Sequence, residues 1–247
     1  ADYGFPQKRR RVFIFAAKQG TDWYESISDN AKSNHYFLDN GFFSKEFPIL
    51  DENDLFLDQE NIFYTKIEKN IQKVSDKFAY PFWKMGIMVS GDVRTEDYKP
   101  IKIRKKSLKS ILQKNVDEKY FVNNTEDIEK WKYLKGAKKE KRIKKDGSVF
   151  YYTEGGIPFP EDLNQPARTI ITREGGQTPS RFKHFIIDPY NEKYRTLTPE
   201  EVERINGFPK GWTKSIPQNW RYFCMGNALV VGLIEKMGKQ LRLGPEV

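Results

Sequence analysis

The most informative stretch for the fold is Arg195-Thr196-Leu197-Thr198-Pro199-Glu200-Glu201, which runs on to Ile205-Asn206-Gly207. Thr198 is a favourable helix N-cap, Pro199 suits the first helical position, and Glu201 stands at the capping-box position. Val202 and Ile205 supply an apolar stripe, and Gly207 is placed to end the helix. The sequence therefore predicts a short helix between Thr198 and Gly207.

Two further elements are predicted near the ends of the chain. The apolar run at residues 12–17 is rich in β-branched and aromatic side chains and predicts a buried strand. A second helix is expected after Gly226, with Asn227 as its N-cap. Apolar residues recur there at helical spacing: Leu229, Val230, Leu233, Ile234, Met237 and Leu241.

The middle of the chain changes in character near Pro81. Residues 18–80 are expected to be mostly irregular, with one helix near 65–77. From Pro81 to about Phe185, turn residues alternate with short apolar runs, which is typical of a small, mostly β domain. Its predicted strands are residues 85–89, 148–152, 167–172 and 182–187.

Composition restricts the class of protein. The 247 residues include 15% aromatics, which argues against disorder, and no apolar run approaches the ~20 residues of a membrane helix. One cysteine and two histidines exclude a disulfide framework and any zinc site built only from Cys and His of this chain. We expect a reducing, cytoplasmic setting. The net charge of +9 is compatible with a polyanionic partner.

Two basic stretches are candidates for binding. Near the N-terminus, Gln7 precedes four consecutive cations, and strand alternation would place Arg9 and Arg11 on one face, where forked guanidiniums could hold a phosphate and a base carbonyl. Between Trp131 and Asp146, lysines that include Lys138 and Lys139 could contact phosphates without reading sequence. The alternative for each stretch is a solvated basic surface.

A third stretch, Pro166 to Gly176, could read bases. Arginine pairs bidentately with guanine, and a threonine methyl group can touch thymine. The alternative is an ordinary edge hairpin. The sole cysteine, Cys224, is expected to be a small buried apolar residue rather than a nucleophile. The residues expected to form the recognition surface are Arg168, Thr169, Thr172, Arg173, Arg181 and Lys183, with His184 as a structural or phosphate-contacting neighbour.

Three stretches, in this order, resemble the last three conserved motifs of the DNA (cytosine-5)-methyltransferase family. Gln7-Lys8-Arg9-Arg10-Arg11 is similar to its Gln-x-Arg-x-Arg motif, Arg195 to Pro209 to the next, and Gly226-Asn227-Ala228 with the following helix to the last. The long basic gap between the first two corresponds to the family's variable target-recognition domain. Three motifs in the right order and spacing make the resemblance specific.

The resemblance implies an α/β fold: part of a Rossmann-like methyltransferase domain plus a small, mostly β recognition domain. It also implies a division of the chain. Residues 1–20 would carry the first strand and arginine motif, residues 21–80 would connect, residues 81–187 would recognise the target, and residues 188–247 would brace that domain and return to the catalytic one.

The implied reaction adds a cysteine thiolate to carbon 6 of a cytosine flipped out of double-stranded DNA, so that carbon 5 takes a methyl group from S-adenosylmethionine. Arg11 would contact the cytosine O2, while Arg9 and Gln7 would hold the site. Asn227, Gly226 and Ala228 would border the cofactor. The family's glycine-rich loop and Pro-Cys nucleophile are absent from the sequence.

The resemblance thus implies the C-terminal portion of a bacterial or phage restriction-modification methyltransferase, active only with a nucleophile-bearing half. That half would be a second subunit or a preceding segment. Two alternatives stay open: a DNA-binding module without enzymatic function, and the family's RNA-methylating branch.

Overall fold

The structure is a computed structural model that describes residues 1–33, 36–50, 62–76 and 79–245. Contacts divide the chain into two units. The first holds residues 1, 3–10 and 104–233, and the second holds residues 2, 11–103 and those from 234 onward. Helices and strands occur in both, which confirms the mixed α/β class. The functional division at 20, 80 and 187 stays a prediction, because these units are defined by contacts alone.

The first unit contains the helix that the sequence predicts after Thr198. As predicted, α4 (Pro199–Ile205) follows Thr198, whose hydroxyl accepts from the Glu201 amide while the Glu201 carboxylate accepts from the Thr198 amide. This reciprocal capping box satisfies backbone donors that the first turn leaves open. The other helical segments are α3 (Thr125–Lys135), α5 (Gln218–Asn227), the beginning of α6 (Val231–Leu243), and the 3-10 turns η4 (Leu108–Ile111) and η5 (Glu118–Tyr120).

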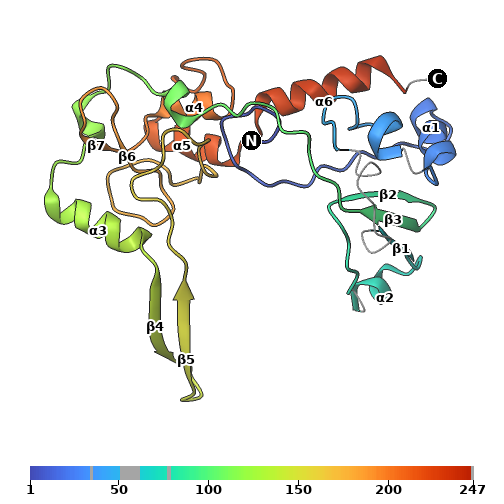
Figure 1. The fold of residues 1–247 in the computed structure, drawn as a ribbon, viewed down its shortest axis with the longest axis horizontal. Coiled ribbons are helices and arrows are strands. Elements are labelled where there is room, and N and C mark those ends of the chain that lie inside the picture. Colours follow the sequence, from blue (N-terminus) through green and yellow to red (C-terminus); the bar gives the residue numbers. More distant parts are fainter. Residues whose placement is uncertain (34–35, 51–61, 77–78, 246–247) are drawn as a thin grey trace. The chain divides into compact units, whose positions relative to one another are not determined.

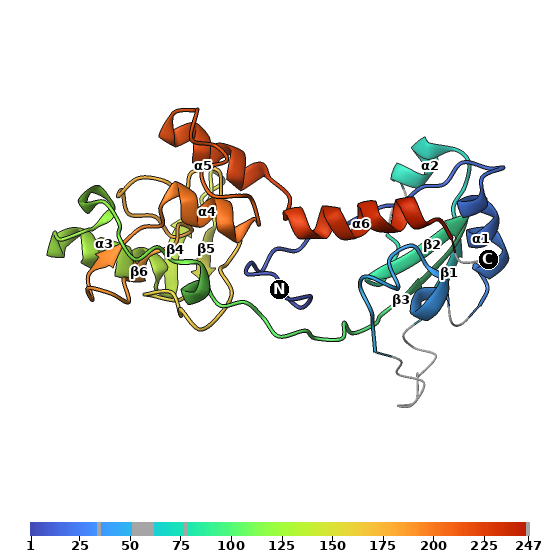
Figure 2. The same cartoon turned by 90° about the horizontal axis from the view of Figure 1, so that it is seen from above.

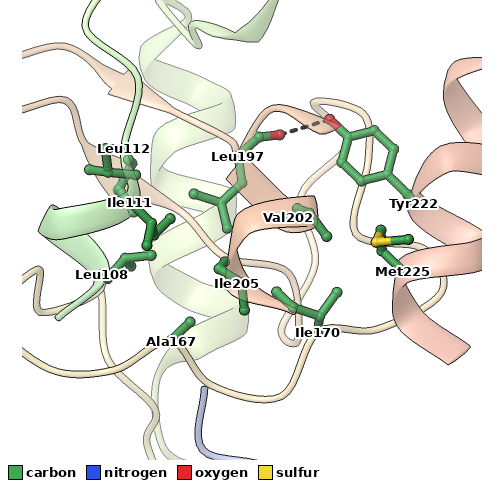
Figure 3. Packing of buried hydrophobic residues seen from close by; sticks show 11 residues of the cluster. Leu108, Ile111, Leu112, Ala167, Ile170, Leu197, Val202, Ile205, Tyr222 and Met225 are labelled. Carbon is green, nitrogen blue, oxygen red and sulfur yellow. Dashed lines mark hydrogen bonds between the residues drawn. The ribbon is translucent and has the colours of Figure 1, made fainter. Parts of the chain in front are cut away.

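The main apolar core of this unit forms around α4. Val202 and Ile205 are fully buried, so the predicted apolar stripe is confirmed. Figure 3 shows them between η4 and α5, with the Tyr222 hydroxyl donating to the Leu197 carbonyl at 2.7 Å. Burial raises the pKa of Tyr222, so this hydroxyl stays a donor.

A second core is aromatic and lies beside α3. Trp131 stacks on Phe185 with ring centroids 4.4 Å apart, and Phe185 stacks on Tyr194 at 5.4 Å. Both Trp131 and Phe185 are fully buried. This stack anchors α3, from which a long hairpin extends.

The strands of the first unit differ from those that the sequence predicts. The prediction at 148–152 is confirmed by β5 (Val149–Glu154), which pairs antiparallel with β4 (Lys138–Ile143). Figure 1 shows this hairpin projecting beyond the end of α3. The predicted strand at 182–187 is reduced to β6 (Ile186–Ile187), paired with β7 (Tyr194–Arg195).

The predicted strand at 167–172 is wrong. Ala167 makes only an isolated bridge with Gln7, and the chain then turns at Ile171 to Glu174. The physical reason is that Arg168 and Glu174 make side-chain bonds that hold the segment as a loop.

The second unit contains an antiparallel sheet in the order β1 (Ile62–Lys66), β3 (Asp92–Glu96), β2 (Met85–Val89). The prediction at 85–89 is therefore confirmed. Figure 2 shows the sheet with α1 (Asp22–Asn30), whose Ile27 packs against a core of Tyr36, Phe37, Ile49 and Tyr98. Further segments of the unit are η1 (Tyr36–Asn40) and α2 (Ile71–Asp76), so the helix predicted near 65–77 forms only in its second half.

The buried strand predicted at residues 12–17 does not form in the structure. Val12 and Ile14 are 86% and 87% exposed, whereas Phe15, the next residue, stacks on Phe42 with centroids 3.9 Å apart. The alternation is that of a strand, but no neighbouring strand in the described part of the chain pairs with it. Without a neighbouring strand, the backbone N–H and C=O groups of this segment have no strand partner to bond, and so no β-ladder forms.

Two predictions about the C-terminal part are corrected. Asn227 does not cap the last helix but ends α5, a helix that the sequence pattern did not predict. Cys224 lies on α5 and is exposed, not buried, because Tyr222 and Met225 form the inward face. In the described part of the chain no helix has the length and apolar character to span a bilayer.

Candidate functional site

The three predicted motifs meet around Gln7 in the first unit. The buried Gln7 side chain donates through Nε2 to Oδ1 of Asn206 at 3.0 Å. Asn206 in turn donates through Nδ2 to the carbonyl of Met225 at 3.0 Å. Asn206, at the end of α4, therefore connects Gln7, which is far away in the sequence, to the last turns of α5.

Arg9 adds a second connection of the same kind. Its guanidinium donates to the carbonyl of Gly226 at 2.8 Å and to that of Ile170 at 3.1 Å. Gly226 stands in the last turn of α5, where carbonyls lack helical partners and a cation is favourable. Arg9 thus closes the helix end and holds it against the 170–172 loop.

Gly226 is required by close packing rather than by its own backbone angles. A Cβ atom at this position would lie 2.4 Å from the Thr172 amide nitrogen and 2.5 Å from the Ile171 carbonyl carbon. A Cβ atom does not approach non-bonded backbone atoms this closely, so a side chain at position 226 would force the backbone to shift. The glycine of the last motif therefore lets α5 lie directly on the loop that the sequence analysis assigned to base recognition.

The two residues after Gly226 differ in exposure. The Asn227 side chain is exposed, with Nδ2 donating to the Phe223 carbonyl at 3.2 Å. Ala228 is half-buried and packs against the core around α4. Arg11 belongs to the second unit and is exposed.

The second of the three motifs begins, just before α4, with a fully buried arginine, Arg195. Its Nε donates to Asp188 at 2.6 Å, and its terminal nitrogens donate to the two oxygens of Glu201 at 2.8 Å each. Burial alone lowers the pKa of Arg195, but the two carboxylates outweigh it and raise the pKa. This ion triad ties β7 to the capping box of α4.

Arg168, predicted to read bases, makes internal bonds. It donates to the Glu161 carboxylate at 2.9 Å through Nε and at 2.6 Å through a terminal nitrogen, and also to the Lys183 carbonyl. Lys135 is buried beside the same carboxylate at 3.1 Å. Burial alone would raise the pKa of Glu161. The hydrogen bond from Arg168 and the neighbouring positive charges lower this pKa by more than burial raises it, so the net shift is downward.

Arg181 and Lys183 are similarly occupied. Arg181 donates to the Leu134 carbonyl at 3.0 Å and forms an ion pair with Glu154 at 3.4 Å. Lys183 donates to the carbonyls of Gly176 and Thr178 at 3.2 Å each, and burial lowers its pKa. These cations hold the 176–183 loop to the end of α3 and the base of the hairpin.

The remaining recognition candidates are more accessible. Thr169 is exposed but donates to the Lys8 carbonyl at 2.9 Å, whereas Arg173 is exposed beside the half-buried Thr172. On the hairpin, Lys138 lies over the Tyr133 ring at 4.3 Å and Lys139 over the Tyr151 ring at 5.1 Å. Lys139 is exposed, so its ammonium above an aromatic face is held loosely and can still reach a phosphate, whereas Lys138 is half-buried.

His184 and Glu174 form a buried pair that the sequence analysis only half anticipated. Both side chains are fully buried, and His184 Nδ1 lies 2.8 Å from Glu174 Oε1. Burial raises the pKa of Glu174, yet the His184 charge and hydrogen bonds from His184 and the Ile171 amide lower it overall. The structural role expected for His184 fits this geometry, and nothing in the sequence paired it with Glu174.

Comparisons with known proteins agree with the convergence of the motifs. The family described as C-5 cytosine-specific DNA methylase matches residues 1–242. The type II methyltransferase M.Sau3AI of Staphylococcus aureus is 42% identical over 98% of this chain, which covers 56% of that protein. The type II methyltransferase M.DsaV of Dactylococcopsis salina is 27% identical over 58% of this chain and 36% of that protein.

The chain therefore spans about half the length, or less, of these relatives. Among solved structures, the Entamoeba histolytica methyltransferase EhMeth is 14% identical, with a TM-score of 0.39, over 74% of this chain and 54% of its own. The S. pombe Dnmt2 methyltransferase is 13% identical, with a TM-score of 0.37, over 74% of this chain and 57% of its own. On the strength of the match over residues 1–242, this chain belongs to the C-5 cytosine-specific DNA methylase family.

Proposed function

We propose that the chain is the DNA-recognising and site-completing portion of a DNA cytosine-5 methyltransferase of a type II restriction-modification system. The observation that carries this proposal is the junction at Gln7 and Arg9. Their hydrogen bonds to Asn206 and Gly226 join all three family motifs within one unit. A family match over almost the whole chain supports the same assignment.

The arginine motif would serve two purposes. Arg9 and Gln7 are positioning residues, since their polar atoms bond to backbone and side chains of this unit. Arg11 is exposed, and we propose that it contacts the O2 of a cytosine flipped out of the duplex. A guanidinium can donate to a carbonyl oxygen without itself changing protonation.

S-adenosylmethionine would supply the methyl group when bound. Of the three residues proposed to border it, Asn227 alone presents an exposed polar side chain, which suits a ligand with hydroxyl and carboxylate groups. Gly226 and Ala228 fit a supporting role, because the Gly226 carbonyl is bonded to Arg9 and the Ala228 amide to Cys224. The residues present therefore suit one side of such a pocket.

The reactive thiolate would come from outside this sequence. The family's nucleophile follows a proline, whereas Cys224, the sole cysteine, follows Phe223 and lies on the exposed side of α5. The partner would be a nucleophile-bearing portion, either a second subunit or a segment of a longer chain. The exposed Val12 and Ile14 offer that portion an unpaired strand-like edge.

DNA would be held by the hairpin and read by the loop next to it. Lys139 would contact phosphates, and the exposed Arg173 with Thr172 would face the base edges. Lys138, which stands opposite Glu154 in the strand register, would help to hold the hairpin. Arg168, Arg181, Lys183 and Thr169 would act mainly by holding these loops in place, given their bonds to internal carbonyls and carboxylates.

The test is reconstitution. The chain is mixed with the part of M.Sau3AI that it does not cover, and transfer of a tritiated methyl group from S-adenosylmethionine to duplex DNA is measured. We expect transfer by the mixture and by neither part alone. Arg11→Ala in this chain should abolish transfer while DNA binding persists, because the proposal assigns Arg11 to the reacting base and not to the DNA backbone.

The same assay separates the alternatives. DNA binding without transfer in any mixture would favour a binding module that has no enzymatic role. Transfer to tRNA in preference to duplex DNA would favour the RNA-methylating branch. Transfer by the chain alone would refute the proposal that the thiolate lies elsewhere.

A further inference from the structure

The β4–β5 hairpin has two chemically different faces. Cross-strand partners in an antiparallel pair point to the same side, and successive residues alternate. The register pairs Lys139 with Thr153 and Lys141 with Tyr151, whereas Lys138 pairs with Glu154 and Glu140 with Tyr152. We define two sets from this register. The lysine face holds Lys139, Lys141, Ile143, Val149, Tyr151 and Thr153, and the balanced face holds Lys138, Glu140, Arg142, Phe150, Tyr152 and Glu154.

On the balanced face the charges are satisfied within the protein. Arg142 forms an ion pair with Glu140 at 3.0 Å and lies over the Tyr152 ring at 3.7 Å. The Tyr152 hydroxyl donates to Glu154, which also pairs with Arg181. Lys138 stands opposite Glu154 in the register. The two cations of this face are therefore matched by its two carboxylates, so an approaching phosphate meets negative as well as positive charge.

On the lysine face the charges are not balanced. Lys139 and Lys141 share it with no acidic residue, and in the part of the chain that the structure describes no carboxylate forms an ion pair with either lysine. Every residue of this face is exposed, whereas Lys138, Glu140, Tyr152 and Glu154 of the balanced face are partly covered. The exposed apolar residues of the lysine face include Ile143 at 71% and Tyr151 at 59%.

The spacing on the lysine face suits a nucleic-acid backbone. Residues two apart on a strand are separated by about 6.8 Å, which equals the rise of two base pairs along the DNA helix axis, about 3.4 Å each. The hairpin also narrows to a turn bearing Lys144 and Lys145, and a two-stranded ribbon can enter the major groove, which is about 12 Å wide. The positive charge, the exposure and the residue spacing of the lysine face are thus all suited to binding DNA.

Building on the proposed function, we propose that the lysine face docks on the phosphate backbone of duplex DNA and that the balanced face points away from it. Lys139 and Lys141 are the contacting cations, with Tyr151 opposite Lys141 on the neighbouring strand. Lys138, although adjacent in sequence to Lys139, contributes to the fold of the hairpin base and not to the docking surface.

The test compares two double variants that remove the same charge from opposite faces. Binding of the full chain to a fluorescent duplex is measured over a range of KCl concentrations for wild type, Lys139→Ala/Lys141→Ala and Lys138→Ala/Arg142→Ala. Each contacted phosphate contributes about 0.9 to the slope of log affinity against log salt. We expect the lysine-face variant to lose about 1.8 from that slope and the balanced-face variant to keep the wild-type value.

The outcomes are distinguishable. If wild type binds DNA and both variants lose equal slope, or the balanced-face variant loses more, the face assignment is wrong while the proposed function stands. If wild type fails to bind DNA even with the catalytic portion present, both are wrong. Circular dichroism and thermal melting check the fold, and Lys139→Gln/Lys141→Gln repeats the test with polar side chains of similar length should the alanine variant unfold.

Discussion

The surroundings of Arg195 and those of the β4–β5 hairpin use basic side chains in opposite ways. Arg195 is fully buried, with two carboxylates within hydrogen-bond distance. Lys139 and Lys141 are exposed on a face that contains no acid. A buried cation must have a compensating charge because the interior solvates it poorly. An exposed lysine is solvated by water and remains available to bind a phosphate.

The difference shows that the role of a basic residue in this chain depends on whether a carboxylate lies beside it in the fold. Its neighbours in the sequence do not decide that role. Arg168 and Arg173 stand five residues apart in one predicted recognition stretch. Glu161 occupies the guanidinium of Arg168, while Arg173 is exposed. The two were expected to act alike, and the structure favours a supporting role for the first.

The largest effect should follow removal of the buried arginine. Arg195→Ala leaves Asp188 and Glu201 buried without their partner, which is expected to cost about 3–5 kcal/mol of unfolding free energy. Arg142→Ala on the hairpin removes an exposed ion pair and should change stability by less than about 0.5 kcal/mol. Urea denaturation of the two variants measures both, and equal losses would abolish the contrast between these regions.

A second contrast concerns how the stability of the fold depends on pH. The folded-state pKa values of Glu161 and Glu174 lie below the ordinary value of 4.5. Each therefore stabilises the fold above that value, and the contribution is lost as the pH falls through the lower folded-state pKa. We expect unfolding free energy to decline progressively below about pH 4.5. Denaturant titrations between pH 7 and pH 3 measure this decline.

Two variants sharpen the acid experiment. Glu174→Gln should be less stable than wild type at pH 7 but should lose less stability on acidification, because the titrating group is gone. Glu154→Gln on the hairpin should change the dependence on pH less than Glu174→Gln does. The Tyr152 hydroxyl lowers the pKa of Glu154 too, but this carboxylate is less buried than Glu174. If the Glu174 variant follows the wild-type curve in shape, the buried pair with His184 is not a source of acid sensitivity.

The smallest contrast uses two glycines. Gly226→Ala places a methyl group 2.4 Å from the Thr172 amide nitrogen, so overpacking of about 1–3 kcal/mol should outweigh the helix preference for alanine, which is about 1 kcal/mol. Gly155→Ala, at the end of the hairpin, meets no atom within 4 Å and should leave stability unchanged or raise it slightly. Thermal melting compares the two, and an unharmed Gly226→Ala would mean that α5 and the 170–172 loop do not pack as described.

Local patterns in the sequence were sufficient for several elements. The capping box at Thr198, the strand at 85–89 and the strand that begins at Val149 all formed as predicted. Each depends on residues close together in the chain, so short-range rules apply. The run at 12–17 failed because a strand needs a partner, and the segment at 167–172 failed because side chains from distant residues hold it as a loop.

The sequence by itself determined the family motifs, their order and the short helix after Thr198, since these are written in neighbouring residues. Only the tertiary structure decided that Gln7 reaches Asn206, that Arg9 closes the end of α5, and which basic residues are already occupied. The physical reason is that a cation's role depends on the carboxylates and carbonyls brought to it by folding. Such a partner can lie far away in the chain, as the Gly226 carbonyl does from Arg9, 217 positions earlier.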